Sequence, residues 1–293
     1  MRNRIKYYVK WRETVLVSKE ELTLQELKNI EFDLLKEFDA FCRQNQIRYF
    51  LAYGTLLGAV RYKGFIPWDD DVDVLVPRED YDKMIKLYKD RGRYRLYSTE
   101  RNPKFGYPFS KLCDMTTKKE EENINNGIEQ GVEIDIFPLD CWDNDIDIAK
   151  KEVKRLKRNM FGLNLAKMIT CSASTPWKCF LLKTMMLGCR MLGNKFFIDR
   201  IIKIGKQKNP NGSAYMGDKV WCPYGERDIC PAEVFSDSIK VEFEGQEFPA
   251  PIGYDTYLTR LYGDYLPEPA KERQKTHHKF NAYRIGNVDY ETE

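Results

Sequence analysis

Four aspartates occupy five consecutive positions of this chain, in the stretch Asp69-Asp70-Asp71-Val72-Asp73. Runs of Asp often cap helices or face solvent. Here, however, apolar residues both precede and follow the run, a frame that a solvated loop would not need. The pattern predicts a strand over 71–76, in which Asp71 and Asp73 point to the same face, about 7 Å apart. Two such carboxylates repel each other, and a divalent cation that both bind is the usual reason to keep the pair.

A glycine-containing turn stands shortly before the acids. Residues 48–52 predict a buried strand, and residues 54–61 predict a short helix that follows it directly. Backbone N–H groups at the start of a helix are suited to phosphate, and a glycine lets a ligand approach the backbone closely. We therefore expect Gly54 and Thr55 to bind the diphosphate of a donor substrate. A divalent metal beside such a turn is typical of enzymes that transfer phosphate groups.

A third acid stands in another apolar strand, predicted over 132–137. Asp135 is flanked there by isoleucines and is expected to join Asp71 and Asp73 as catalytic residue and metal ligand; a cap for the following turn is the alternative. Three acids suit one or two Mg²⁺ ions, or Mn²⁺, because Mg²⁺ keeps positions for water and substrate phosphate. We expect Asp135 to accept the proton of the acceptor hydroxyl. Asp69 and Glu133 are the alternative bases, or else groups that support the metal ligands from behind.

Three cations near these motifs are candidates for binding the donor phosphates. Arg61 and Lys63 follow the predicted short helix, and Lys111 lies on a strand predicted over 107–114. Phosphoryl transfer requires mainly positioning and the neutralisation of developing charge, which fixed cations provide. A plain salt bridge is the alternative for each of the three, and Arg61 is the first choice.

Three blocks of the sequence together resemble a known family. The stretch GTLLGAVRYKGFIPWDDDVD at 54–73 is similar to the signature of the LicD family, phosphocholine transferases of bacterial surface glycans that are related to fukutin and fukutin-related protein. GVEIDIFPLD at 131–140 resembles the next motif. The third comprises the shorter matches FEG at 243–245, PAP at 249–251, YGDY at 262–265 and HH at 277–278. The resemblance covers about residues 22–280, and it implies an α+β fold with a nucleotidyltransferase-like mixed sheet flanked by helices.

The resemblance also implies a reaction. The expected activity is Mg²⁺-dependent transfer of phosphocholine from CDP-choline to a hydroxyl of a cell-surface glycan precursor, of teichoic acid or lipopolysaccharide type, with release of CMP. Alternatives are another CDP-alcohol donor, such as CDP-ribitol or CDP-glycerol, and nucleotidyl transfer from a nucleoside triphosphate. An inactive membrane adaptor would have no reason to keep the acids. Aromatic faces usually hold a quaternary ammonium, and Trp68 is an expected substrate contact. His277 and His278 are expected to face an anionic part of the substrate, and a pair of histidines with no such role is the alternative.

Composition favours a cytoplasmic protein. No apolar stretch of signal-peptide length follows the basic N-terminus, and no uncharged apolar run approaches the roughly 18 residues that span a bilayer. The eight cysteines include no C-x-x-C pair, so free thiols are expected rather than disulfides. A zinc site built from Cys222, Cys230 and the two histidines fits no usual ligand spacing.

Local patterns predict further elements. Thr23 and Glu26 can form a capping box, and apolar residues follow at helical spacing, so a helix is expected from Leu24 to about Asn45. A second helix is expected around Tyr254–Tyr262. The polar stretch 116–130 is expected to be a surface excursion near the site, and residues 172–176 are expected to break the basic segment into two helical pieces.

The chain divides into three regions by charge and composition. We expect a catalytic core over 1–145, a basic helical segment over 146–210, and an aromatic-rich region over 211–293 that completes the substrate site. Residues 150–208 contain fifteen Lys and Arg but two acids. That excess suits either a helical segment docked on the inner face of the membrane, where a lipid-linked glycan acceptor would be presented, or core helices with a solvated basic face. No nucleic-acid-binding motif is recognisable, and no nucleic acid partner is expected.

Overall fold

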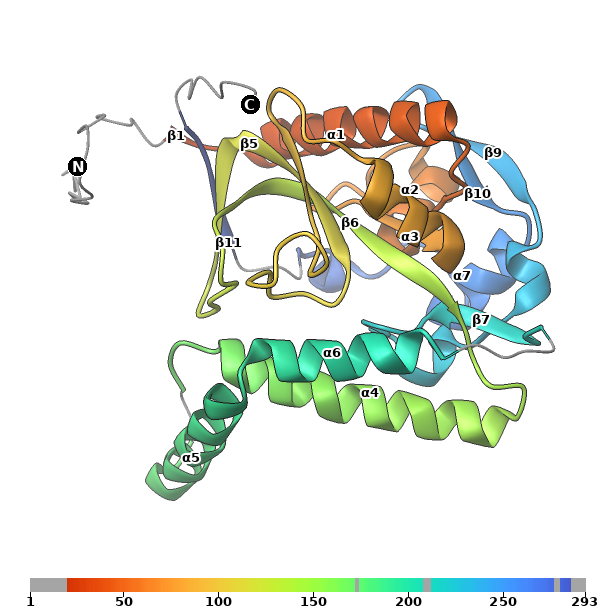
Figure 1. Ribbon diagram of the computed structural model, residues 1–293. Helices are drawn as coiled ribbons and strands as arrows, with labels where there is room; N and C mark the ends of the chain where they lie inside the picture. Colours follow the sequence, from red (N-terminus) through yellow and green to blue (C-terminus); the bar gives the residue numbers. More distant parts are fainter. Residues whose placement is uncertain (1–19, 172–173, 208–211, 277–279, 286–293) are drawn as a thin grey trace.

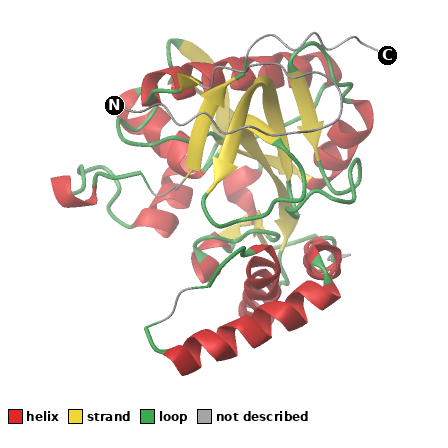
Figure 2. Cartoon of the chain, turned by 90° about the vertical axis from the view of Figure 1, so that its left-hand side faces the viewer, coloured by secondary structure: helices red, strands yellow, loops and turns green. Residues whose placement is uncertain are grey.

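The computed structural model describes residues 20–171, 174–207, 212–276 and 280–285. In these residues a nine-stranded mixed sheet forms the centre (Figures 1 and 2). Its strands lie in the order β1-β11-β5-β6-β3-β2, with β4 beside β5, β7 beside β6, and β8 beside β7. The strands of this sheet are β1 (Glu20–Glu21), β2 (Phe50–Leu51), β3 (Asp73–Pro77), β4 (Tyr94–Tyr97), β5 (Ser110–Glu121), β6 (Gln130–Cys141), β7 (Tyr215–Asp218), β8 (Cys230–Pro231) and β11 (Phe280–Arg284). The predicted α+β class with a mixed sheet flanked by helices is confirmed.

Helices cover the sheet from both sides. The helices are α1 (Leu24–Asn45), α2 (Tyr53–Tyr62), α3 (Arg78–Leu87), α4 (Ile146–Lys167), α5 (Pro176–Leu192), α6 (Asn194–Gly205) and α7 (Tyr254–Tyr262), with short 3-10 turns at Gly225–Asp228, Ala232–Phe235 and Lys271–Arg273. In Figure 1, α1 lies along the top of the sheet, where it packs on β5 and β6, and α4 and α6 run side by side below. A separate hairpin of β9 (Ser238–Phe243) and β10 (Gln246–Pro251) lies at the far end of α1.

Helix α1 begins where the local sequence predicts. Thr23 and Glu26 form a capping box at the start of α1, in which the Thr23 hydroxyl accepts the N–H of Glu26 and the Glu26 carboxylate accepts the N–H of Thr23. The helix then buries an apolar stripe at the spacing of three and four residues, Leu27, Ile30, Leu34, Leu35 and Phe38. This stripe fixes α1 against the sheet, and the predicted helix over 24–45 is confirmed.

Two local predictions fail at the strands around the acids. β3 begins at Asp73, so Asp71 lies in the loop before the strand and not on its face. The polar stretch 116–130 is not a surface excursion, because β5 extends to Glu121 and β6 begins at Gln130. The extension of β5 pairs with β11, from Thr117 opposite Arg284 to Glu121 opposite Phe280. That partner comes from the far end of the chain, and local polarity gives no sign of it.

The basic segment forms three helices rather than two. The predicted break near Pro176 separates α4 from α5, and a second break falls at Gly193, whose φ of 79° ends α5 and starts α6. No helix in the described part of the chain has both the length and the apolar content that crossing a bilayer requires. All eight cysteines are free, as predicted. The C-terminal region contributes β7, β8 and β11 to the central sheet, so this region and the first 145 residues share one core.

Candidate active site

Asp73 and Asp135 lie side by side because β3 and β6 pair in parallel. The two residues are in register at the start of the pair, and the N–H of Asp135 donates to the carbonyl of Val72 over 2.8 Å. Asp73 is buried, and the side chain of Asp135 is half-buried. The structure therefore places Asp135 on the strand next to Asp73, although the two lie far apart in the sequence.

The loop before β3 brings together three further carboxylates. One oxygen atom each of Asp69, Asp70 and Asp71 lies within 4.8 Å of the other two. Burial raises the pKa of Asp73 well above its usual value, and the negative charges of Asp71, Asp135 and Asp69 raise it further. The acids of the loop therefore interact electrostatically with Asp73 on β3. The acids of the loop and those of the β3–β6 pair therefore form one electrostatic cluster.

A buried lysine of α1 holds this loop. The ammonium of Lys28 donates to the carbonyl oxygens of Ile66, over 2.9 Å, and Pro67, over 3.0 Å. Lys28 lies within the apolar stripe of α1 and is itself buried. A buried ammonium needs hydrogen-bond acceptors, and these two carbonyls provide them. The position of the acidic loop thus depends on α1.

The turn before α2 also supports the acids. A Cβ atom added at Gly54 would lie 2.6 Å from Oδ2 of Asp69, so the absence of a side chain lets that carboxylate approach the start of the helix. The hydroxyl of the buried Thr55 accepts the N–H of Asp73 over 2.8 Å. The side chain of Thr55 therefore positions β3, and the phosphate contact of its backbone N–H stays a prediction.

Lys111 forms ion pairs with two acids of β6, which is the alternative to its predicted phosphate contact. Its side chain is 5% exposed, and its ammonium lies 2.9 Å from Glu133 and 3.1 Å from Asp135. Lys119 binds the same oxygen of Glu133 over 2.9 Å. Burial alone would raise the pKa of Glu133, but the two lysines outweigh it and hold the pKa at about 2. Glu133 is therefore an anchored anion. This state favours its predicted alternative role, that of holding Asp135 in place through Lys111, over the role of a base.

The other predicted cations differ from each other. Lys63 is a surface residue, 72% exposed, and forms an ion pair with Glu242 of β9 over 3.1 Å, which is the alternative to its predicted phosphate contact. Arg61 is half-buried over the ring of Tyr62, and its Nη2 atom is buried with no hydrogen-bond partner among the described residues. Arg61 thus remains available for an anionic ligand.

Trp68 is half-buried against Tyr62, with 6.3 Å between the ring centroids, and directly precedes the acidic loop. His277 and His278 lie outside the described residues.

The C-terminal region borders the acids with tyrosines. Tyr224 stacks on Tyr53 at 5.7 Å and meets the ring of Tyr262 at 5.2 Å, with 3.0 Å between the two hydroxyls. Burial raises the pKa of Tyr224 to about 12, and the charges of Asp73 and Asp71 contribute to the rise. These rings therefore lie beside the acidic cluster, where a substrate bound there would meet them.

Tyr53 opens α2 in a left-handed conformation, with φ of 45°, which non-glycine residues rarely adopt. Its buried hydroxyl donates toward Asp228, over 3.0 Å, and Asp218, over 3.3 Å. Strain of this kind persists only where the surroundings hold it in place. Neither the strained residue nor its two acidic partners was predicted from the sequence, because no local pattern marks them.

A lysine of the basic segment also reaches the site. Lys167, the last residue of α4, is 4% exposed, and its ammonium lies 3.4 Å from the ring centroid of Tyr107. Lys111 approaches the same ring at 4.4 Å. No carboxylate or carbonyl of the described residues lies within ion-pair or hydrogen-bond distance of the Lys167 ammonium. Burial lowers the pKa of Lys167 to about 7, against the opposing charge of Glu121.

The end of α4 is fixed to the loop between β5 and β6. The N–H of Asn125 donates to the carbonyl of Lys167 over 2.9 Å, and the N–H of Ile169 donates to the carbonyl of Asn123 over 3.0 Å. The side chain of Asn123 binds both backbone groups of Thr170. These bonds set the position from which Lys167 enters the site.

Glu31 is a further buried acid near the cluster, and it was not predicted from the sequence. Its carboxyl group is fully buried on α1, and neither oxygen has a hydrogen-bond partner among the described residues. Burial raises its pKa well above the usual value, and the charges of Asp71, Glu133 and Asp70 act in the same direction. The signal was present in the sequence, since Glu31 interrupts the apolar stripe of α1 at helical spacing.

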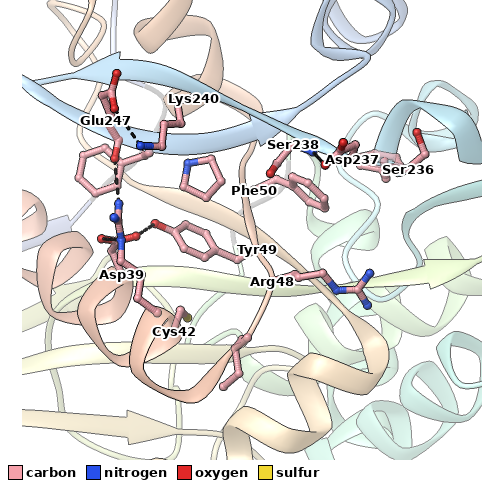
Figure 3. A pocket seen from close by; sticks show the side chains of 15 residues that line it. Asp39, Cys42, Arg48, Tyr49, Phe50, Ser236, Asp237, Ser238, Lys240 and Glu247 are labelled. Carbon is pink, nitrogen blue, oxygen red and sulfur yellow. Dashed lines mark hydrogen bonds and ion pairs between the residues drawn. The ribbon is translucent and has the colours of Figure 1, made fainter.

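A cavity of about 320 Å³ lies apart from these acids, between the end of α1, β2 and the β9–β10 hairpin (Figure 3). Most of its charged groups are paired: Arg43 with Asp39 over 2.7 Å, Lys240 with Glu247 over 3.1 Å, and Arg48 with Asp80 over 2.8 Å. The hydroxyl of Tyr49 also donates to Asp39. The cavity therefore offers a ligand little uncompensated charge, and the acidic cluster is the better candidate for catalysis.

Comparison with known proteins agrees with this choice. Residues 46–141, which contain the turn, the acidic loop and the β3–β6 pair, match the family model LicD/FKTN/FKRP, nucleotidyltransferase domain. The chain is 32% identical over 273 residues to the lipopolysaccharide cholinephosphotransferase LicD of Haemophilus influenzae, a match that covers 90% of this chain and 98% of that protein. The chain belongs to the LicD family. The resemblance and the nucleotidyltransferase-like fold are thus confirmed, and the LicD-family chain is an enzyme of the transferase class.

Shorter matches link this LicD-family chain to two proteins named only as uncharacterized. One, of Rickettsia typhi, is 38% identical over 68 residues, which are 22% of each chain. The other, of Rickettsia prowazekii, is 45% identical over 49 residues, which are 17% of this chain and 18% of that protein.

The buried acids below Tyr53 predict a dependence of stability on pH. Burial raises the pKa of Asp218 to about 6 and that of Asp228 to about 7, the latter also through the charge of Asp218. The unfolded chain releases these protons near pH 4. The folded state therefore holds more protons between about pH 4 and 7, and the free energy of unfolding should fall as the pH rises through this window.

Urea unfolding at several pH values measures this slope. Asp228→Asn should flatten it, by up to a few kcal/mol across the window, whereas the exposed Asp237→Asn should not. An unchanged slope in Asp228→Asn would show that Asp228 ionises normally in the folded protein.

Proposed function

We propose that this enzyme transfers phosphocholine from CDP-choline to a hydroxyl group of a cell-surface glycan precursor and releases CMP. One observation carries the proposal: the acids of the β3–β6 pair stand beside the α2 turn, in a chain that matches a lipopolysaccharide cholinephosphotransferase along 98% of the length of that protein. Lipopolysaccharide or teichoic acid precursors would be the acceptors. The reaction would take place on the cytoplasmic side of the membrane.

The acidic cluster suits Mg²⁺ or Mn²⁺. Carboxylate oxygens are the ligands these ions prefer, and the oxygens of Asp69, Asp70 and Asp71 already lie within 4.8 Å of one another. Asp71, Asp73 and Asp135 would hold the ion, with Asp69 and Asp70 adjacent. When bound, it would supply positive charge against the diphosphate of the donor and the departing CMP.

The side chains of this protein divide the remaining work. The acceptor oxygen attacks the phosphorus that carries choline, the bond from that phosphorus to the CMP oxygen breaks, and Asp135 takes the hydroxyl proton, with Asp69 as the alternative base. Lys111 orients Asp135 through the ion pair of 3.1 Å. The backbone at Gly54 and the cations Arg61 and Lys167 would bind the donor phosphates.

The choline group needs aromatic faces that are not already in use. Two lysine ammoniums approach the ring of Tyr107, at 3.4 and 4.4 Å. Tyr224 and Tyr262 border the acids, and Trp68 adjoins the acidic loop. A cation–π contact favours a quaternary ammonium by about 0.5–2 kcal/mol, so these three rings are the proposed choline contacts, and CDP-ethanolamine should be a weaker donor.

A donor screen tests the proposed reaction. Purified protein with Mg²⁺ and a glycan acceptor would be given CDP-choline, CDP-ribitol, CDP-glycerol or one of the four nucleoside triphosphates, and the nucleotide product would be identified. CMP release from CDP-choline above all other donors is expected. Pyrophosphate released from a triphosphate, with no CMP from CDP-choline, would instead establish a nucleotidyltransferase.

Removal of single carboxylates should abolish transfer without loss of the fold. Asp71→Asn, Asp73→Asn and Asp135→Asn each remove a metal ligand, so Mg²⁺ should no longer raise the melting temperature as it does for the unaltered protein. Without metal, each variant should be as stable as the parent or slightly more so, because like charges repel less. The exposed Asp147→Asn is the control. Near-normal turnover in any one of the three would remove that residue from the site.

Lys167→Met should raise the KM for CDP-choline several-fold and leave the free energy of unfolding unchanged or higher. The reason is that a buried ammonium with no anionic partner costs desolvation in the absence of substrate and gains a partner when a phosphate binds. Lys178→Met, a change of an exposed lysine in the same segment, is the matched control. An unchanged KM with reduced stability would assign Lys167 a purely structural role.

A further inference from the structure

Exposed apolar side chains concentrate on one helix. Among the described residues, fifteen large hydrophobic side chains are exposed, and ten of these lie between Phe161 and Phe196. Within α5, Met186 is the one buried residue of the described helix, whereas Phe180 is 75% exposed. Seven of the ten belong to α5: Trp177, Phe180, Leu181, Met185, Leu187, Met191 and Leu192. Soluble monomers seldom expose so much apolar surface together unless it binds something.

The exposed residues of α5 share one side of the helix. At about 100° per residue, the side that packs on α4 and α6 consists of the buried and half-buried residues Cys179, Leu182, Met186 and Cys189. The seven exposed apolar residues occupy the opposite half, and no charged residue interrupts them. The two borders between these halves carry the cations Lys178, Lys183 and Arg190. In Figure 1, α5 projects from the lower left of the molecule, away from the sheet.

The charge of the surroundings points to one kind of partner. α5 has no acidic residue, and the two acids of residues 150–208 are paired, Glu152 with Lys219 over 2.9 Å and Asp199 with Lys195 over 2.7 Å. The segment therefore presents a large surplus of positive charge around an apolar strip. A second copy on the same face would bring its own cations against these and be repelled. Anionic lipid headgroups complement both features at once.

We propose that α5 is a membrane-docking helix that lies in the plane of an anionic lipid surface. Its apolar half enters the boundary between headgroups and acyl chains, and Lys178 and Lys183 reach the headgroups from its two borders. Binding of this kind needs no substrate, so it can be tested independently of the proposed reaction.

Co-sedimentation with vesicles tests the proposal on the full-length protein. The probes are vesicles of phosphatidylcholine alone and vesicles in which about one third of the lipid is phosphatidylglycerol, at low and high salt. The protein should sediment with the anionic vesicles, less at high salt, and the emission of the exposed Trp177 should shift to shorter wavelength. Trp177→Phe should remove that shift while sedimentation persists.

Two charge substitutions complete the test. Phe180→Glu with Leu187→Glu should reduce sedimentation by about tenfold, and circular dichroism would verify the fold. Leu266→Glu, at a residue that is 65% exposed but outside the basic segment, should bind as the parent does. Absence of sedimentation, equal sedimentation with neutral vesicles, or undiminished sedimentation of the doubly substituted protein would overturn the proposal. So would a dimer in sedimentation velocity that Phe180→Glu dissociates in the absence of lipid.

Discussion

The parallel pairing of β3 with β6 places two carboxylates side by side, and much of the surrounding structure compensates for their charge. Asp73 and Asp135 meet there in register, with the acids of the preceding loop close by. Buried charges are costly unless they are paired. Lysines of the neighbouring strand β5 provide the pairing: Lys111 binds Asp135 and Glu133, and Lys119 binds Glu133 again. The fold thus places the lysines of β5 next to the acids that it gathers on β3 and β6.

Elements that do not contact Asp73 or Asp135 also help to hold the acidic site in place. On one side, α1 uses Lys28 to hold the carbonyls of the acidic loop. On the other, the strained Tyr53 is held through its hydroxyl by Asp228 and Asp218 of the C-terminal region. Strain and buried ionisable groups both reduce stability. Their concentration around one cluster of carboxylates is what an enzyme that binds highly charged substrates requires, because such a site must be rigid before the substrate arrives.

The sequence predicts those features that short-range physics determines. The helices at 24–45 and 254–262 follow from a capping box and from apolar spacing, and the structure contains both with these bounds. The apolar neighbours of Asp135 predict that it lies on a strand, and it lies on β6. What the sequence could not show depends on distant partners. Lys63 pairs with Glu242 across the fold, and Lys167 reaches Tyr107 only because Asn123 and Asn125 bind the end of α4. No local pattern encodes such contacts.

The same long-range contacts connect helix α5 of the basic segment to the candidate active site. Arg190 of α5 donates to the carbonyls of Met168 and Ile169, directly after Lys167, and the next bonds lead to the β5–β6 loop. A force that holds α5 therefore acts on the backbone that carries Lys167. If α5 rests on a lipid surface, the surface would also fix the end of α4 and thereby the cation beside Tyr107. A glycan acceptor built on a lipid carrier would then meet a site in which Lys167 is already held in position by the membrane-bound helix. This would be a physical reason for one segment to combine exposed apolar residues with a buried lysine.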